Sequence, residues 1–311
     1  MSATNSGMEP KQVTASGDSI RARPTTSTSN RTALAPTKQP PTNGSYSELL
    51  VEQSDRICII TFNRVAACNA LTRRGCYELI RALNDAKFNE AITTIVITGA
   101  AGYFTAGTDF TQTRNLSDKE MRAYFTASNT VLRYLTKAFI YCPKVLVAVV
   151  DGACIGIGLV IAALCDVIYC TERAYFQAPF TKLGICTEGA LSYLLPQLIG
   201  RVKASELLTF GTRLSAQDAL QSNLVARIVS NTLVKDELWP QLEEYSRLPA
   251  ESLRANKRLL TKTERINVDR ALNAECFELE RLRMSAAHKR ALEELQEHIG
   301  GYKNRANKSK L

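Results

Sequence analysis

The order of elements along the chain limits the fold more than any other feature. Short runs rich in β-branched residues are each followed by a glycine-containing corner and then by a helix. Residues 92–98 form one such run before Gly99, and residues 145–150 form another before Gly152. Neither run is polar enough for a half-exposed strand, so both are expected to be buried on two faces. The pattern predicts an α/β fold with a parallel sheet.

Helical periodicity fills the segments between these runs and most of the chain after Gly184. Thr72 is expected to cap the first helix, and Ser117 with Glu120 forms a capping box at the start of a long one. Further strands are predicted at 49–52, 56–63 and 166–170. Helices are predicted at about residues 72–86, 117–139, 156–164, 190–198, 204–210, 216–221, 235–247, 250–262 and 269–298.

The chain divides into four segments by composition. Residues 1–45 are rich in Ser, Thr, Asn, Pro and Gly with few large apolar residues, so we predict a disordered polar arm. Its Arg content and scarcity of acids also fit a transit peptide, but its prolines and the lack of an apolar stripe favour the first interpretation. An ordered core is expected at 46–250, a helical region at 251–300 and a flexible tail at 301–311.

The last three residues, Ser309-Lys310-Leu311, form the tripeptide that the peroxisomal import receptor reads at an exposed chain end. The alternative is a chance tripeptide on a basic tail. We therefore predict a peroxisomal protein with the import receptor as a partner. Dual targeting to mitochondria through the N-terminal arm is the weaker alternative.

Composition and charge argue against several classes of protein. The nine cysteines form no C-x-x-C pair, which indicates reduced thiols and neither a disulfide framework nor a zinc site. His288 and His298 are expected at the surface, so a Ser-His-Asp triad and a His-rich metal site are both disfavoured. The net charge of +9 is spread along the chain without aromatic-basic repeats, which argues against nucleic acid. No run is long and apolar enough to span a membrane.

Two glycine-rich loops stand where strands end, at residues 103–109 and 151–158. Glycine at such a corner permits close backbone approach, and the free N–H groups of a following helical turn can point at a ligand. Two loops that face each other would hold one carbonyl oxygen between two amides, as an oxyanion hole does. Tight turns use the same residues, so the glycines alone leave both interpretations open.

The order of several motifs resembles the crotonase (enoyl-CoA hydratase/isomerase) superfamily over about residues 48–265. The matching stretches are Phe104-x-Ala106-Gly107-x-Asp109, Asp151-Gly152 with Gly156-x-Gly158, 163–166, Leu183-Gly184 and 214–219. The resemblance implies a spiral of ββα units over 46–250 with a helical trimerisation region at 251–300. It also implies an acyl-CoA substrate, a homotrimer or hexamer, and no cofactor or metal, because coenzyme A is part of the substrate.

The resemblance assigns roles to residues of the two loops. It implies that the N–H groups of Thr108 and Ile157 form the oxyanion hole for the thioester. Substrate-binding positions are expected at Ala106, Gly107, Thr108, Asp109, Phe110 and Ile157. We expect a structural or substrate-lining role for Asp109, not a catalytic one. Lys257 and Lys262 are expected either to meet the phosphates of coenzyme A or to lie on a solvated helix face.

The acid and base residues distinguish the reactions of this superfamily. Hydratases carry two glutamates, at positions that Val160 and Phe180 occupy here. Neither side chain can transfer a proton, so hydration is disfavoured. Glu188, in the segment 183–189, is similar to the single catalytic glutamate of peroxisomal Δ3,Δ2-enoyl-CoA isomerases. From the sequence alone, a helix-start glutamate favoured by the helix dipole is the preferred interpretation of Glu188, and the resemblance reverses that preference.

A single carboxylate suits a reaction that moves a double bond. It can remove a proton at C2 and return one at C4, because no water has to be activated. The resemblance thus predicts conversion of 3-enoyl-CoA to trans-2-enoyl-CoA in the β-oxidation of unsaturated fatty acids. The alternatives are a non-catalytic acyl-CoA-binding protein of this fold and another reaction of the superfamily, either thioester hydrolysis or weak hydration.

Overall fold

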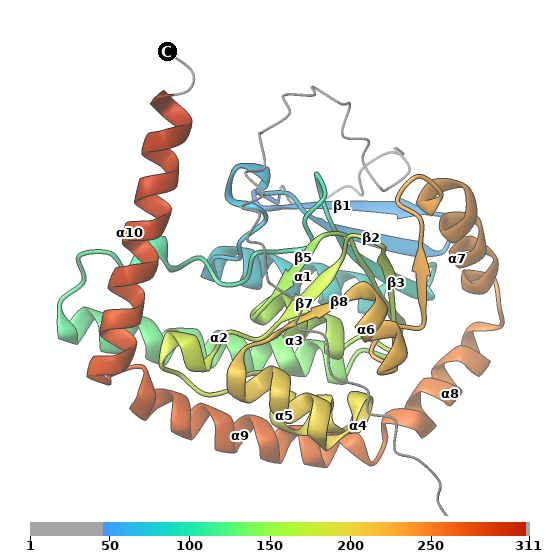
Figure 1. Cartoon of the computed structure of the whole chain (residues 1–311). Helices are drawn as coiled ribbons and strands as arrows, with labels where there is room; N and C mark the ends of the chain where they lie inside the picture. Colours follow the sequence, from blue (N-terminus) through green and yellow to red (C-terminus); the bar gives the residue numbers. More distant parts are fainter. Residues whose placement is uncertain (1–45, 309–311) are drawn as a thin grey trace, which may run out of the picture. The chain divides into compact units, whose positions relative to one another are not determined.

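A computed structural model describes residues 46–308, with side chains described up to residue 298. It contains a six-stranded sheet in the order β1-β2-β3-β4-β6-β9, of which Figure 1 labels β1, β2 and β3. β1 and β2 are antiparallel, and each later pair of neighbours is parallel. The strands are β1 (Leu49–Ser54), β2 (Ile57–Phe62), β3 (Thr94–Gly99), β4 (Val145–Val150), β6 (Val167–Thr171) and β9 (Arg227–Val229).

Side chains of the central strands alternate between two apolar layers, as the period of a β-strand requires. Ile60 of β2 and Ile97 of β3 pack on one face into the main core, with helices α1 (Arg73–Phe88), α2 (Asp118–Ile140) and α3 (Ile157–Ala163). Ile59 and Val96, next to them in sequence, pack on the other face against Trp239 of α7 (Trp239–Ser246). Both faces are therefore covered, which confirms the prediction of a doubly buried parallel sheet.

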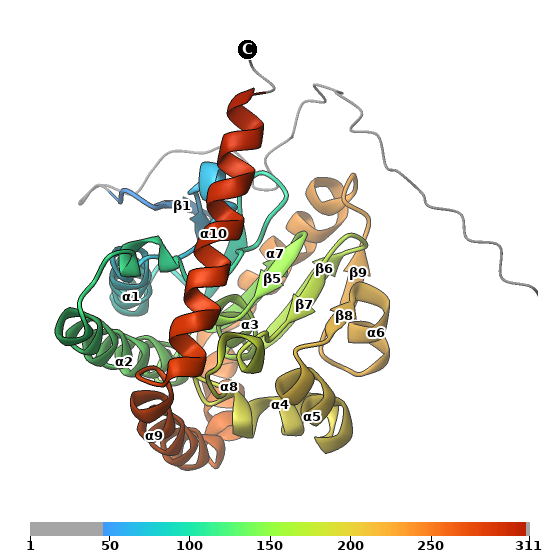
Figure 2. The ribbon, with the colours of Figure 1, turned by 60° about the vertical axis from the view of Figure 1, so that its left-hand side comes forward.

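A second, three-stranded sheet in the order β5-β7-β8 lies at the ends of these strands. β5 follows β4, and β7 follows β6, so successive turns of the chain place one strand in each sheet (Figure 2). These short strands were not predicted from the sequence. They are β5 (Ala153–Ile155), β7 (Tyr175–Gln177) and β8 (Arg213–Ser215).

The predicted helices are present, with bounds that differ by a few residues. Thr72 caps α1 by accepting from Gly75 N, and Ser117 with Glu120 forms the expected capping box of α2. The helices of the core are α1 (Arg73–Phe88), α2 (Asp118–Ile140), α3 (Ile157–Ala163), α4 (Leu191–Ile199), α5 (Arg201–Phe210) and α6 (Ala216–Gln221). Those that follow are α7 (Trp239–Ser246), α8 (Ala250–Thr261), α9 (Glu264–Leu282) and α10 (Ala286–Lys308).

The helix predicted at 269–298 is in fact two helices, α9 and α10, which meet at an angle (Figure 1). Ser285 explains the break, because its hydroxyl accepts from His288 N and so caps the start of α10. α10 then continues to Lys308, into the segment 301–311 that we expected to be a flexible tail. The predicted arm at 1–45 and the tripeptide 309–311 lie outside the described residues. None of the described helices has the length and apolar character that a membrane span requires.

Candidate active site

The two glycine-rich loops lie against each other. Thr105 N donates to Ala153 O at 2.9 Å, and Ile155 N donates to Thr105 O at 3.1 Å. Gly152 has φ +64°, and a Cβ there would lie 2.2 Å from Gly102 O. A Cβ on Gly158 would lie 2.4 Å from Thr105 Cγ2. The glycines are therefore required for the close approach that we predicted for the loops.

Two backbone amides from these loops are free to bind a ligand. Leu71 N donates to Gly107 O and Asp109 N donates to Leu71 O, so the N–H of Thr108, between them, points away from Leu71. Ile157 is the first residue of α3, where backbone N–H groups have no partner within the helix. Within residues 46–298 neither amide donates a hydrogen bond to the protein. Both have the free donor that an oxyanion hole requires.

Glu188 is buried beside these amides. A pocket of about 40 Å³ is lined by Thr108, Ile157 and Glu188. Its other walls come from the start of α1, from α2 and from the residue after α9. They are Leu71, Thr72, Arg73, Cys76, Tyr124, Ser128, Val131, Leu132 and Arg283. Glu188 is the only carboxylate in this described lining, so one acid faces two amide donors and a largely apolar wall.

Glu188 does not cap a helix, although that was the alternative interpretation of the sequence. α4 begins at Leu191, and its first amides are bound by another carboxylate, Glu275 of α9. Glu275 accepts from Ala190 N at 2.6 Å and from Ser192 N at 2.8 Å. Because Glu275 neutralises the start of α4, the Glu188 carboxylate is left for the pocket.

Arg283 binds Glu188 from the end of α9. Its Nη2 lies 2.8 Å from Glu188 Oε2, and both side chains are buried. Burial raises the pKa of Glu188, while the charge of Arg283 and its hydrogen bond lower it; the net direction is upward from the ordinary value. The sequence does not single out Arg283, because this residue lies within the helix predicted at 269–298.

The positions of the hydratase glutamates are apolar and filled. Val160 and Phe180 are almost completely buried. A Cβ on Gly189 would lie 2.2 Å from Val160 Cγ1, so Val160 packs against the backbone next to Glu188. The ring of Phe180 would lie 3.9 Å from a Cβ on Gly156. Neither of these two positions therefore supplies a second acid to the pocket of Glu188.

Only Thr108 and Ile157, of the six predicted substrate-binding residues, line this pocket. Ala106 and Gly107 shape the loop, and Phe110 packs with Tyr124 in a separate apolar cluster. Asp109 forms an ion pair with Arg64 at 2.9 Å. Burial alone would raise the pKa of Asp109, but hydrogen bonds from Thr111 and the Arg64 guanidinium bring it below its ordinary value. Asp109 therefore holds the loop as a fixed anion, in line with the expected structural role.

Two other predictions are wrong. His288 was expected at the surface, yet it is 1% exposed, and its Nδ1 donates to Leu183 O at 2.5 Å. Lys257 was expected either at coenzyme A phosphates or on a solvated face. It is buried, lies 2.7 Å from Asp166 Oδ2 and donates to Lys144 O. It therefore joins α8 to the sheet. Lys262, which has the same pair of predicted roles, is exposed.

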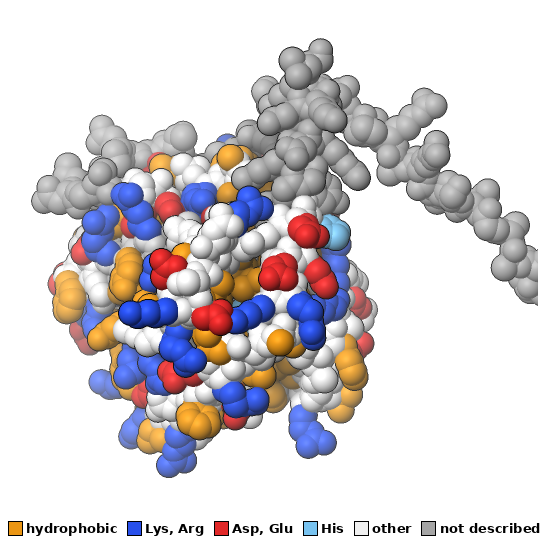
Figure 3. All heavy atoms as spheres, turned by 90° about the vertical axis from the view of Figure 1, so that its left-hand side faces the viewer, with side chains coloured by type: hydrophobic (Ala, Val, Ile, Leu, Met, Phe, Trp, Pro, Cys, Tyr) orange, Lys and Arg blue, Asp and Glu red, His pale blue; other side chains and the backbone are white. Residues whose placement is uncertain are grey.

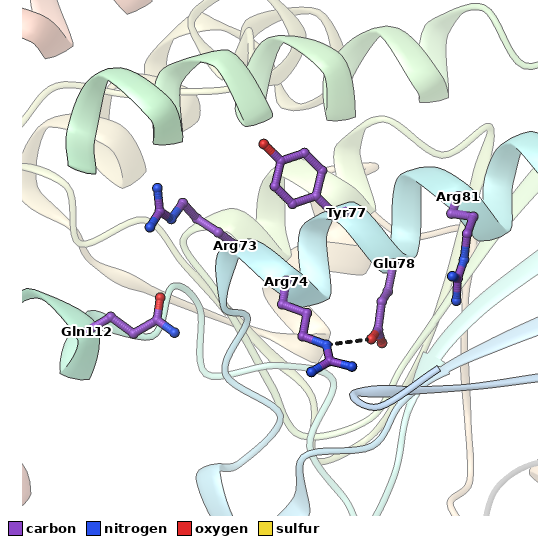
Figure 4. A pocket seen from close by; sticks show the side chains of 6 residues that line it. All are labelled: Arg73, Arg74, Tyr77, Glu78, Arg81 and Gln112. Atoms are coloured by element: carbon purple, nitrogen blue, oxygen red, sulfur yellow. Dashed lines mark hydrogen bonds and ion pairs between the residues drawn. The ribbon is translucent and has the colours of Figure 1, made fainter. Parts of the chain in front are cut away.

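A groove with a volume of about 520 Å³ runs along the outer side of α1, lined by Arg73, Arg74, Tyr77, Glu78, Arg81 and Gln112 (Figure 4). Arg74 pairs with Glu78, whereas Arg73 stacks on the ring of Tyr124 at 4.4 Å. Arg73 lines both this groove and the pocket of Glu188. Elsewhere on the surface, acidic and basic side chains are interspersed on the face shown in Figure 3.

The thiols of the chain are free, as predicted. Cys76 lies in the wall of the pocket, and burial, followed by the charges of Glu188 and Glu48, raises its pKa to about 12. A thiol with this pKa is not a thiolate nucleophile near neutral pH. Within the described residues no group of His, Cys, Asp and Glu side chains is placed to hold a metal ion.

Comparisons with known proteins agree with this geometry. Residues 52–301 match the enoyl-CoA hydratase/isomerase family. Enoyl-CoA delta isomerase 2 of Rattus norvegicus is 36% identical over 231 residues, which are 74% of this chain and 59% of the relative. The peroxisomal enoyl-CoA delta isomerase 3 of Mus musculus is 34% identical over 218 residues, 70% of this chain and 68% of the relative. The chain thus spans about three fifths of the length of the rat relative.

Solved structures show the same fold. An enoyl-CoA hydratase/isomerase from Pseudoalteromonas atlantica T6c has a TM-score of 0.74 at 28% sequence identity, covering 81% of this chain and 98% of that one. An enoyl-CoA hydratase from Mycobacterium avium subsp. paratuberculosis K-10 has the same TM-score at 25% identity, covering 82% and 97%. The predicted α/β class, a crotonase-like fold with helices at its C-terminal end, is confirmed.

Proposed function

Because the chain belongs to the enoyl-CoA hydratase/isomerase family, we propose that it is a Δ3,Δ2-enoyl-CoA isomerase acting in the β-oxidation of unsaturated fatty acids. The observation that carries this proposal is the lone carboxylate. Glu188 faces two unpaired amides, while Val160 and Phe180 leave no second acid to activate a water. The names of the rat and mouse relatives support the same reaction.

The proposed mechanism follows from these groups. The thioester oxygen accepts hydrogen bonds from Thr108 N–H and Ile157 N–H, and Glu188 removes a proton from C2. The C2–H electrons form a dienolate whose negative charge lies mainly on the thioester oxygen. The enolate then collapses: the carbonyl re-forms, C2 and C3 become doubly bonded, and C4 takes the proton back from Glu188. Each amide donor is expected to supply about 3 kcal/mol of transition-state stabilisation.

The proposal is tested with Glu188→Gln and a 3-enoyl-CoA such as trans-3-hexenoyl-CoA. Glutamine keeps the shape of the side chain but cannot accept the proton, so turnover should fall by about 10²- to 10⁴-fold. Glu280→Gln removes an exposed carboxylate of α9 and should leave turnover unchanged. Parental turnover in Glu188→Gln would refute the role of this base.

Product mass distinguishes this reaction from the alternatives. Isomerisation leaves the mass of the thioester unchanged, hydration adds one water, and hydrolysis releases free coenzyme A. Binding of acyl-CoA without any change on all positional isomers would instead identify a non-catalytic member of the family.

We also propose that the protein acts in the peroxisomal matrix and is delivered by the import receptor. The terminal Ser309-Lys310-Leu311 and the peroxisomal relative in mouse support this location. A fluorescent protein fused ahead of the full chain should co-localise with a peroxisomal marker, and deletion of the three residues should disperse it. A second fusion, with the fluorescent protein after the chain so that the N-terminal arm stays first, should show mitochondrial signal only if that arm is a transit peptide.

A further inference from the structure

An arginine at the end of α9 reaches the candidate base. Arg283 is the C-cap of α9 and keeps helical backbone angles, and Ser285 caps α10 two residues later. The side chain of Arg283 lies in the pocket wall and binds Glu188. Arg283 is 7% exposed, which is unusual for arginine unless a partner neutralises it.

The guanidinium has anchors that do not depend on Glu188. Arg283 Nη1 donates to Asn129 Oδ1 of α2, and the guanidinium carbon lies 5.3 Å from the centre of the Phe125 ring. A planar cation fixed by an amide oxygen and an aromatic ring presents its remaining nitrogen in a defined direction. Nη2 therefore stands as a fixed donor for Glu188 Oε2.

The two oxygens of Glu188 have different surroundings. Oε2 accepts from Arg283 at 2.8 Å, whereas Oε1 receives no hydrogen bond from residues 46–298. Oε1 is therefore the oxygen that is available to a substrate in the pocket. Burial at this depth disfavours the charged form of a carboxyl, and an adjacent cation favours it.

We propose that Arg283 is a positioning residue, which keeps Glu188 ionised and holds it by Oε2 so that Oε1 carries the proton between C2 and C4. The inference rests on the proposed function, because it concerns the same base. The neighbouring charge of Glu275 opposes ionisation but is itself bound by the start of α4. Other titratable and charged groups surround Glu188 and Arg283. They are Arg73 and Cys76 of α1, Tyr124 of α2, Glu275 and Cys276 of α9, His288 of α10, and Cys186 in the segment before Glu188.

The test is the pH dependence of kcat/KM for trans-3-hexenoyl-CoA with the full chain. Arg283→Met and Arg283→Gln remove the positive charge, so the base should ionise only at higher pH. The acidic limb of the profile should move up by about 1 to 3 pH units, because an adjacent opposite charge shifts a carboxylate by that amount. Activity at pH 6 should fall at least about tenfold and recover towards pH 9.

Matched variants separate this role from a structural one. Arg283→Lys keeps the charge and should keep the acidic limb near its parental position. Arg281→Met removes an exposed arginine that pairs with Glu278 on the same helix, and its profile should match the parental one. A folded Arg283→Gln protein whose acidic limb stays within about 0.3 pH units of the parental limb would overturn the proposal.

A measurement without turnover keeps this inference distinct from the proposed function. The carboxyl ¹³C resonance of Glu188, assigned by its absence in Glu188→Gln, reports the ionisation directly. It should titrate at higher pH in Arg283→Gln than in the parental chain. If the parental chain shows no isomerase activity but this shift occurs, the proposed function fails and the role of Arg283 in ionising Glu188 stands. An unchanged titration refutes the role of Arg283 even if the isomerase activity is present.

Discussion

At the scale of single residues, the environment of His288 links the C-terminal helix to the loop that carries the candidate base. Its ring donates to Leu183 O, five residues before Glu188, and lies 5.3 Å from the Phe125 ring. Nε2 has no hydrogen-bond partner in the described part of the chain. Burial lowers the pKa of His288, the hydrogen bond to Leu183 raises it, and Arg283 lowers it; the net direction is downward.

This downward shift predicts a loss of stability in acid. The unfolded chain binds the His288 proton more tightly than the folded chain does. The contribution of His288 to the free energy of unfolding is therefore complete above the ordinary histidine pKa, and it is lost as the pH falls through the pKa of the folded state. One such group changes the free energy of unfolding by at most about 1.4 kcal/mol per pH unit. Urea unfolding between pH 7.5 and 5.5 should show a smaller loss for His288→Gln than for the parental chain.

His298→Gln is the matched control, because His298 is exposed on the same helix. Its unfolding free energy should follow the parental pH dependence. The raised pKa values of the buried carboxyls Glu188 and Glu275 change the free energy of unfolding with pH in the opposite direction. The test is therefore the difference in pH dependence between the variants, and not the pH dependence of the parental chain alone. If the free energy of unfolding depended on pH in the same way in His288→Gln and His298→Gln, the downward pKa shift of His288 would be contradicted.

At the scale of elements, the site depends on how α9 holds the start of α4. Glu275→Ala would leave the buried N–H of Ala190 and the part-buried N–H of Ser192 without their acceptor. Each buried unsatisfied donor costs about 1–3 kcal/mol, so the free energy of unfolding should fall by roughly 2–4 kcal/mol in chemical denaturation. Turnover should fall as well, because Glu188 lies just before this helix.

Glu278→Ala tests the specificity of that effect. Glu278 lies one helical turn further along α9 but is half-exposed and pairs with Arg281 at the surface. Its removal should change the free energy of unfolding by no more than about 0.5 kcal/mol. Equal losses in the two variants would mean that the capping contact contributes little.

The sequence was sufficient for elements that local chemistry defines. The capping residues Thr72 and Ser117 marked two helix starts, and the β-branched run before Gly152 marked a buried strand. The strands of the small sheet escaped prediction because three residues are too few for a periodic signal. Ser285 could have shown the break before α10, since Ser favours N-caps, but the helical charge spacing on both sides concealed it.

For the site, the glycine corners indicated the two loops but left an anion site and plain tight turns both open, and the family resemblance assigned Thr108 and Ile157 within them. Glu188 could be assigned as the candidate base only through the family resemblance, because an isolated glutamate near a helix start carries no distinctive sequence pattern. Arg283 and Asn129 lie 154 residues apart, and only the packing of α9 on α2 brings them together. Such long-range contacts between helices have no signature in a single sequence.

At the scale of the whole molecule, exposed apolar side chains on α8 and α9 favour self-association. Leu260 is 77% exposed and Phe277 is 72% exposed, and Leu259 and Ile266 lie on the same two helices. Large apolar surface left open in a single chain indicates an interface. Together with the trimer implied by the family resemblance, these residues predict a homotrimer or hexamer built through this region.

Light scattering coupled to size-exclusion chromatography tests that prediction. The parental chain should elute with the mass of three or six copies, and Leu260→Glu combined with Phe277→Glu should shift it towards one copy. Substitution of Tyr77 by Glu, an exposed aromatic residue on α1, should leave the assembly intact. A parental protein that is monomeric at micromolar concentration would show that these side chains serve another purpose.

The contact between Val160 and Gly189 limits how the candidate site could be redesigned. A glutamate introduced at position 160, to give it the water chemistry of its hydratase relatives, would press on the very turn that presents Glu188. Glutamate is longer than valine and the position is fully buried, so its surroundings would have to shift to admit it. Converting the site thus requires more than the exchange of one side chain.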